Sequence, residues 1–155
     1  MTNGVHLRDV TDDDLPILSE HQRDPVAVQM AFFPSRDWDA FQAHWAKIRA
    51  DKQVIIRTIL VDGQVAGNVL SFVQDGERDV GYWIGREFWG RGIATRALAE
   101  FLTVDQTRPL FARVAKHNTG SRRVLEKCGF VLRGEDLAPA IAGSDAVEDF
   151  VLRLD

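Results

Sequence analysis

Two Asp-Gly pairs near the middle of the chain constrain its fold more than any other feature. They are Asp62-Gly63 and Asp75-Gly76. Asp-Gly readily adopts the left-handed backbone of two-residue hairpin turns, so each pair predicts a tight turn between antiparallel strands. Runs rich in β-branched and apolar residues flank these turns, at 54–61, 64–73 and 78–84. The sequence therefore predicts three consecutive antiparallel strands.

The residues before these strands predict one strand and two helices. A β-favouring run at 5–10 predicts the strand. Asp13 is the expected N-cap of the first helix, because this places Pro16 in the first turn, at the third helical position. The second helix is predicted from apolar residues at helical spacing, which are Trp38, Phe41, Trp45 and Ile48. Such a stripe is more typical of core packing than of a ligand platform.

The rest of the chain alternates between helices and strands. The pattern predicts helices at 91–104 and 121–127, strands at 110–115, 130–133 and 146–154, and a loop at 134–145. The whole order predicts a single domain over 1–155 with an α/β (α+β) fold. We expect a mixed, mostly antiparallel sheet of about seven strands, about four helices and one right-handed parallel crossover.

Composition narrows the class of protein. A chain of 155 residues suits one domain. Its 19 Lys and Arg residues against 23 Asp and Glu residues give a net charge of -4, which argues against a nucleic-acid partner. No apolar run approaches the ~18 residues of a membrane span, and the first residues lack a signal-peptide pattern, so no membrane partner is expected.

Cysteine and histidine usage points to a protein without metal in a reducing compartment. The single cysteine, Cys128, cannot form an intramolecular disulfide, which favours the cytoplasm. The four histidines lie on different predicted elements, so no metal site is expected.

A glycine-rich stretch at 81–95 is the best candidate for a ligand site. Gly90 and Gly92 allow a positive φ, and the helix that follows offers unpaired N–H groups and a positive dipole end to a phosphate. Arg91 adds a cation and Thr95 a hydroxyl. A glycine-rich connector without a ligand would explain the glycines equally well. A P-loop is excluded because Ile93 stands where lysine is needed, and a dinucleotide fingerprint fits only weakly.

A second polar stretch lies at 114–130, between a predicted strand and a short helix. Asn118 and Ser121 stand at the start of that helix. N-capping is the common use of these residue types and is the favoured interpretation of the residues alone. The alternative is that both side chains face a groove.

Taken together, the two stretches resemble the GNAT superfamily of N-acetyltransferases, most closely the branch that contains the ribosomal-protein-alanine N-acetyltransferases. The family pattern is Gln or Arg, two residues, Gly, one residue, then Gly or Ala. Gly92 and Ala94 match it, with Trp89 in the Gln/Arg position. Asn118 and Ser121, followed by Leu125-Glu126-Lys127-Cys128-Gly129-Phe130, resemble the second family motif. The resemblance covers nearly the whole chain.

This resemblance implies a fold, a ligand and a reaction. The fold would be GNAT-like, with a parted central pair of strands. The ligand would be acetyl-CoA, and the reaction would move its acetyl group to a primary amine, either a protein N-terminus or a small amine, by direct attack in a ternary complex. The implied donor-binding residues are Trp83, Ile84, Gly90, Arg91, Gly92, Ile93, Ala94, Thr95, Asn118 and Ser121. A backbone N–H of Ile84 or Trp83 would polarise the thioester oxygen.

The catalytic acid and base are less clearly indicated. Many relatives carry a tyrosine as acid where this chain has Leu125, and its only tyrosine is Tyr82. Ser121 is the nearest hydroxyl by motif and becomes the candidate acid. Asp79 is the first candidate base. Glu148 and Asp149 are the second candidates, and any of the three would act through water.

The missing tyrosine leaves other functions open. One alternative is a non-catalytic acyl-CoA-binding sensor or regulatory module. Another is a nucleotide-binding protein that uses the glycine-rich loop. Exposed strands at the end of the sheet would allow a homodimer.

Overall fold

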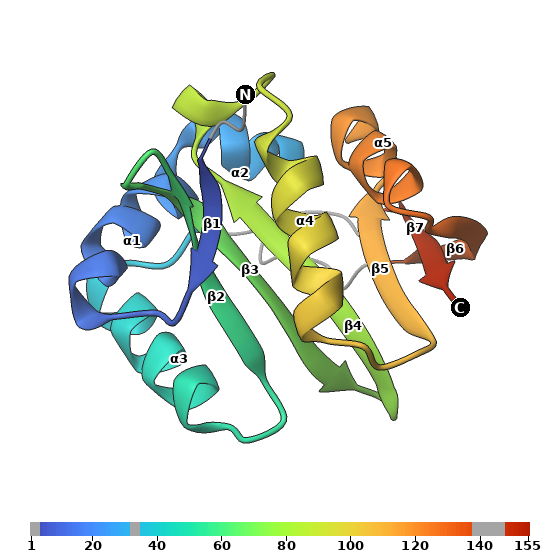
Figure 1. Ribbon diagram of the computed structural model, residues 1–155, viewed down its shortest axis with the longest axis horizontal. Coiled ribbons are helices and arrows are strands. Elements are labelled where there is room, and N and C mark those ends of the chain that lie inside the picture. Colours follow the sequence, from blue (N-terminus) through green and yellow to red (C-terminus); the bar gives the residue numbers. More distant parts are fainter. Residues whose placement is uncertain (1–3, 32–34, 138–147) are drawn as a thin grey trace.

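The fold is one mixed sheet with helices on both faces (Figure 1). The structure is a computed structural model and describes residues 4–31, 35–137 and 148–155. The seven strands have the order β1-β2-β3-β4-β5-β7-β6, and all neighbours are antiparallel except β4 and β5. The predicted fold class is confirmed, including a parallel crossover from β4 through α4 to β5.

Strands and helices alternate along the chain much as predicted. The strands are β1 Val5–Arg8, β2 Ile55–Val61, β3 Gln64–Gln74, β4 Glu77–Ile84, β5 Leu110–Ala115, β6 Val131–Leu137 and β7 Glu148–Leu154. The α-helices of the described part are α1 Leu15–Arg23, α2 Pro25–Ala31, α3 Trp38–Ala50, α4 Ile93–Val104 and α5 Thr119–Lys127. The expected number of about four helices is therefore one too low.

The additional helix, α2, has a local start signal. Asp24 precedes Pro25, and its carboxylate accepts hydrogen bonds from the N–H groups of Val26 at 2.9 Å and Ala27 at 3.4 Å. An acidic N-cap followed by proline in the first helical position is a known start pattern. It could have predicted this helix from the sequence.

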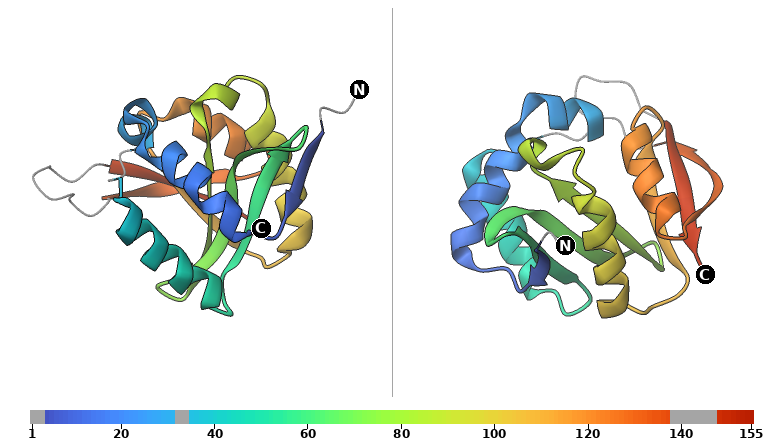
Figure 2. Two further views of the ribbon diagram at one scale, coloured as in Figure 1. Left: turned by 90° about the vertical axis from the view of Figure 1, so that its left-hand side faces the viewer. Right: turned by 45° about the horizontal axis from the view of Figure 1, so that its top comes forward.

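The helices cover the two faces of the sheet unequally (Figure 2). α4 and α5 lie on one face, and the larger core cluster lies beneath them, with Leu98 and Phe101 fully buried. α1 and α3 lie on the other face over a smaller cluster. Of the predicted aromatic stripe on α3, Phe41 and Trp45 are buried in this smaller cluster. Trp38 remains at the surface and stacks on Phe41 at 6.1 Å between ring centroids.

The start of the first helix differs from the prediction. Asp13 is not the N-cap, because residues 12–14 form a 3₁₀ turn and α1 begins at Leu15 with Pro16 in its second position. The reason is Asp14, whose buried carboxylate binds Arg8, the N–H of Thr11 and the Thr58 hydroxyl. These tertiary contacts hold the turn in place.

The end of the chain also differs from the prediction. Residues 134–137 of the loop expected at 134–145 instead belong to β6, which pairs with β7 from Val131 to Leu137. Pairing with a neighbouring strand overrides the local glycine signal at Gly134, where the register shifts. Residues 138–145 of that loop, and 146–147 of the last predicted strand, lie outside the described residues.

The central parallel pair of strands is parted. The register between β4 and β5 contains one pair, Asp79 with Phe111, although both strands continue beyond it. A gap therefore opens between the carboxyl ends of β4 and β5, as the family resemblance implied.

The β3–β4 pair is close-packed at the edge of this gap. A Cβ added to Gly67 on β3 would collide with the carbonyl oxygen of Trp83 on β4. Because that oxygen belongs to the backbone, it cannot move away without shifting β4. Gly67 is therefore needed for the close approach of the two strands.

We predict that Gly67→Ala lowers the free energy of unfolding by about 2 kcal/mol, as overpacking of a closed site does. Urea denaturation measures this change. Gly81→Ala in the same strand pair is the control, because its added Cβ would be 3.9 Å from Leu70, an ordinary contact. Equal stability of the two variants would contradict the prediction.

Asp14 makes the stability of the fold dependent on pH. Burial raises the pKa of its carboxyl, but the hydrogen bonds from Arg8, Thr11 and Thr58 lower it more, to about 2. The folded state thus favours the ionised carboxylate. The resulting stability is present above about pH 4 and is lost as the pH falls towards 2.

We predict that wild type loses about 2 kcal/mol more stability than Asp14→Asn between pH 5 and pH 2. Urea denaturation across this range measures the difference. Hydrogen bonds from Ser71 and Arg78 outweigh burial and lower the pKa of Asp105 to about 2 as well. Asp105 is present in both proteins, so their difference isolates Asp14. Parallel pH profiles would refute the prediction.

Candidate active site

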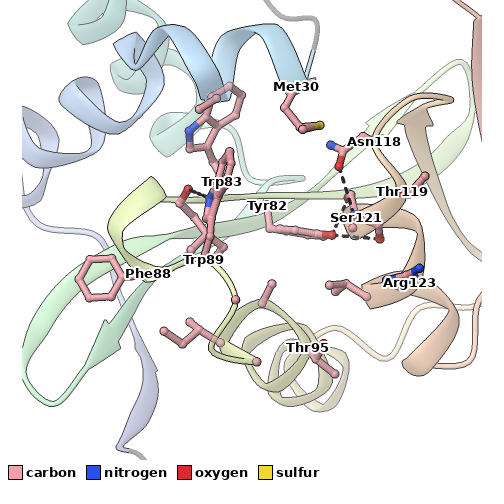
Figure 3. A pocket seen from close by; sticks show the side chains of 18 of the residues that line it. Met30, Tyr82, Trp83, Phe88, Trp89, Thr95, Asn118, Thr119, Ser121 and Arg123 are labelled. Atoms are coloured by element: carbon pink, nitrogen blue, oxygen red, sulfur yellow. Dashed lines mark hydrogen bonds between the residues drawn. The ribbon is translucent and has the colours of Figure 1, made fainter.

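A cavity of about 570 Å³ lies at the gap between β4 and β5 (Figure 3). Its walls come from the end of β4, the loop before α4, the first turn of α4, one side of α5, and α2. All the predicted donor-binding residues line it except Arg91. The guanidinium of Arg91 instead lies over the Phe88 ring, at 5.6 Å from its centroid.

The glycines before α4 adopt the backbone predicted for them. Gly90 and Gly92 both have φ of 74°, and Gly92 is the N-cap of α4. A Cβ at either position would meet nothing within 4 Å, so the conformation, rather than lack of space, favours glycine. The first backbone bond into this cap comes from Arg96, at 3.2 Å to Gly92 O. The N–H groups of Ile93, Ala94 and Thr95 precede it at the helix start, beside the cavity.

At the end of β4, the backbone N–H and C=O of Ile84 point towards the gap. The Gly85 N–H donates to Ala66 O on β3 at 2.8 Å, and the Trp83 carbonyl also faces β3, beside Gly67. Neighbouring residues of a strand alternate in direction, so the N–H and C=O of Ile84 point away from β3. Of the two backbone donors considered from the sequence, only that of Ile84 faces the gap.

The start of α5 brings two hydroxyl groups together. Asn118 caps the helix, as predicted, because its side-chain oxygen accepts the Ser121 N–H at 3.2 Å. The Ser121 hydroxyl lies 2.6 Å from the hydroxyl of Tyr82 on β4 (Figure 3). Burial raises the pKa of Tyr82 to about 12, although the hydrogen bond with Ser121 opposes this rise. The phenol therefore keeps its proton at neutral pH.

From the sequence, Tyr82 was only the single tyrosine of the chain, away from position 125, where many relatives carry a catalytic tyrosine. Tyr82 lines the cavity together with Ser121. The available signal was its position two residues before Ile84, because residues i and i+2 of a strand share a face. Its contact with Ser121, 39 residues away, is tertiary and could not be read from local patterns.

Asp79 lies apart from the cavity. It is three residues before Tyr82, which places its side chain on the opposite face of β4. The carboxyl is buried, its Oδ2 is 3.4 Å from Arg113 Nε, and its Oδ1 has no hydrogen-bond partner among the described residues. Burial raises the pKa of Asp79, and Arg113 partly opposes this. Asp79 does not line the cavity.

The second candidate bases lie on β7. Asp149 pairs with Ala115 in the antiparallel register of β5 and β7. The side chain of Glu148 lies outside those that the structure describes. Asp149 is not among the described residues that line the cavity.

α2 supplies a wall that the sequence did not predict. Ala27 and Met30 line the cavity from this helix. Ionic and polar contacts hold α2 at both ends: Arg86 pairs with Asp24 at 2.9 Å, and His117 Nε2 donates to the Gln29 carbonyl at 3.0 Å. These contacts join α2 to the loops that follow β4 and β5.

Two general features of the described residues are also relevant. Within 4–31, 35–137 and 148–155, no group of three or more His, Cys, Asp or Glu side chains is arranged to hold a metal ion. None of the helices in these ranges has the length and apolarity needed to cross a membrane.

Comparison with known proteins identifies the family. The family model for an acetyltransferase (GNAT) domain matches residues 5–131. Because the match spans most of the chain, the chain belongs to the GNAT acetyltransferase family. The family resemblance that the two motifs predicted is confirmed.

One curated relative is from Bacillus subtilis (strain 168) and bears the name "Putative ribosomal N-acetyltransferase YdaF". It is 33% identical over 98 residues, which are 59% of this chain and 54% of the relative. The chain thus spans about half the length of this curated relative. The match agrees with the branch that the sequence resembles.

Solved structures share the fold at low sequence identity. Spermidine N-acetyltransferase from Vibrio cholerae, in complex with CoA and spermine, has a TM-score of 0.85 and 16% identity over 99% of this chain and 96% of that chain. RimL, a ribosomal L7/L12 alpha-N-protein acetyltransferase in complex with coenzyme A, has a TM-score of 0.81 and 15% identity over 99% and 94%. These similarities support the same fold over nearly the whole chain.

Proposed function

We propose that the protein transfers the acetyl group of acetyl-CoA to a primary amine by direct attack in a ternary complex. One observation carries this proposal: three features meet at one cavity. They are the start of α4 with its two left-handed glycines, the end of β4 with backbone groups that point away from β3, and the paired hydroxyl groups of Tyr82 and Ser121. These are the parts needed to bind a diphosphate, polarise a thioester and stabilise a departing sulfur. The family and the CoA complexes of its structural neighbours support the same reaction.

The donor would bind across the helix start and the free edge of β4. The N–H groups of residues 93–95 and the dipole of α4 suit the diphosphate. Arg123 and Lys127 line the cavity from α5 and add positive charge. The amide groups of the pantetheine arm can pair with the backbone of Tyr82 and Ile84, which faces the gap.

In the proposed transfer step, the amine lone pair attacks the thioester carbon and the carbon–sulfur bond breaks. The Ile84 N–H stabilises the negative charge that develops on the carbonyl oxygen. Because the raised pKa keeps Tyr82 protonated, its O–H can donate to Ser121 Oγ. The Ser121 proton then points to the departing sulfur. A thiolate with an ordinary pKa near ~8.5 is a weaker base than this phenolate, so the pair acts mainly through hydrogen bonds.

The proton of the attacking amine needs an acceptor. Asp79 stays a prediction as this base, and since it lies outside the cavity lining, transfer to it would run through water. Its unpartnered Oδ1 and raised pKa suit a proton acceptor.

The acceptor class is suggested by relatives. The curated relative is named as a ribosomal N-acetyltransferase, and the solved neighbours act on spermidine and on ribosomal L7/L12. We therefore include protein N-termini and polyamines among the candidate acceptors. A cytoplasmic location fits such substrates and stays a prediction, as does a homodimer.

We predict that the protein releases free CoA from acetyl-CoA when a suitable amine is present. The panel contains N-terminal peptides of ribosomal proteins, spermidine, aminoglycosides and amino acids, and thiol release measures turnover. Mass spectrometry of the amine verifies the acetyl product. A rise in melting temperature with acetyl-CoA but no turnover with any amine would favour the acyl-CoA-binding module instead. Stabilisation by ATP or NAD but not by CoA would favour the nucleotide-binding alternative.

We predict that Ser121→Ala and Tyr82→Phe each lower kcat by roughly a hundredfold. The reason is that each breaks the same hydroxyl pair, so the double variant should be about as slow as either single variant. Steady-state kinetics with the best amine of the panel measure this. Thr103→Ala is the control, since its hydroxyl donates to Glu100 O on the exposed end of α4. Additive losses in the double variant would exclude a shared role.

A further inference from the structure

We propose that Trp89 is a positioning residue for acetyl transfer. Its indole N–H holds the carbonyl of Ile84 and thereby keeps the N–H of the same residue directed at the thioester oxygen. This inference rests on the proposed function and adds a residue to it. Trp89 lines the cavity, and its indole N–H donates a hydrogen bond to the backbone of β4.

The hydrogen bonds around Ile84 show how Trp89 can fix the orientation of its backbone. Trp89 Nε1 donates to Ile84 O at 2.8 Å, from the loop that precedes α4 (Figure 3). The peptide between Ile84 and Gly85 is therefore bound on both sides, because the Gly85 N–H donates to Ala66 O at 2.8 Å. Rotation of this peptide would break both bonds. The N–H and C=O of one extended residue share a direction, so the same bonds fix where the Ile84 N–H points.

The charge arrangement makes this contact important for the reaction. Without the indole, the lone pairs of the Ile84 carbonyl would face the gap in which the thioester oxygen becomes negative. A carbonyl oxygen beside an oxyanion raises the energy of the transition state. Indole is a donor without an acceptor group, so it pairs with this carbonyl and adds no lone pair of its own to the gap. Ile84 is buried, which limits the ability of water to replace the indole.

If Trp89 served only to fill space, its replacement would affect the chemical step differently. An aromatic residue that only fills space can be replaced by phenylalanine with little effect on the chemical step. Trp38 provides a matched comparison, because 37% of it is exposed against 38% of Trp89. Trp38 stacks on Phe41 of α3, outside the cavity lining.

The test compares Trp89→Phe, Trp89→Gln and Trp89→Met with wild type and with Trp38→Phe. Gln and Met have similar lengths, but only the Gln side chain has an N–H to donate. One measurement is kcat and KM for acetyl-CoA with the amine that wild type acetylates fastest. The other is the infrared carbonyl stretch of bound acetyl-CoA labelled with ¹³C at the thioester carbonyl, which reports polarisation without turnover.

We expect Trp89→Phe to lower kcat about tenfold and to change KM less than about threefold, as loss of one hydrogen bond that acts in the transition state would do. The carbonyl band should move from its wild-type position back towards that of free acetyl-CoA. Trp89→Gln should be faster than Trp89→Met, and Trp38→Phe should match wild type. If Trp89→Phe does not fold, the Gln and Met variants still test the donor.

The outcomes separate this inference from the proposed function. A wild-type enzyme that turns over, with Trp89→Phe equal to it in kcat and in band position, would overturn the positioning role and leave the function intact. A rise in KM alone, or equal rates for the Gln and Met variants, would also overturn it. A wild-type band at the position of free acetyl-CoA would overturn both the positioning role and the proposed contact with Ile84. No acetyl transfer to any amine would overturn the proposed function itself.

Discussion

The parting of β4 and β5 is the constraint on which the rest of the site depends. Two parallel strands that share one register pair leave backbone donors and acceptors without strand partners at their carboxyl ends. Such groups are costly when buried unless something else binds them. Trp89 donates to the carbonyl of Ile84, and in the proposed reaction the N–H of Ile84 binds the thioester oxygen. The gap is therefore the edge of the sheet at which we propose that the acetyl donor binds.

The same gap is spanned by contacts that fix its width. Tyr82 on β4 reaches Ser121 on α5, and α2 is held between the loops that follow the two strands. The hydrogen bond between Tyr82 and Ser121 therefore also holds the proposed hydrogen-bond donor to the departing sulfur in place. Stability of the gap and placement of the hydroxyl pair cannot be varied independently. In the proposed reaction, this coupling gives a role to a tyrosine that lies outside the usual family position.

Local signals predicted much of this fold, and contacts between distant residues account for what they missed. Hairpins at Asp-Gly, left-handed glycines before α4 and the Asn118 cap depend on neighbouring residues, so the sequence is sufficient to place them. Asp13 was wrongly chosen as N-cap because Asp14 is held by Arg8 and by Thr58, which is 44 residues away. The pairing of Tyr82 with Ser121 has the same origin, since only the folded sheet brings the two together.

Strand alternation gives the proposed reaction its direction. Tyr82 and Asp79 are three residues apart on β4, so they lie on opposite faces of the sheet. The sulfur would leave on the face where Tyr82 meets Ser121, and the amine would lose its proton towards the face that carries Asp79. A closed sheet would separate these two events by its backbone. The strands part only beyond the pair of Asp79 with Phe111, so in the proposed reaction a thioester in the gap lies further along β4 than Asp79, and the amine proton would reach this carboxylate through water.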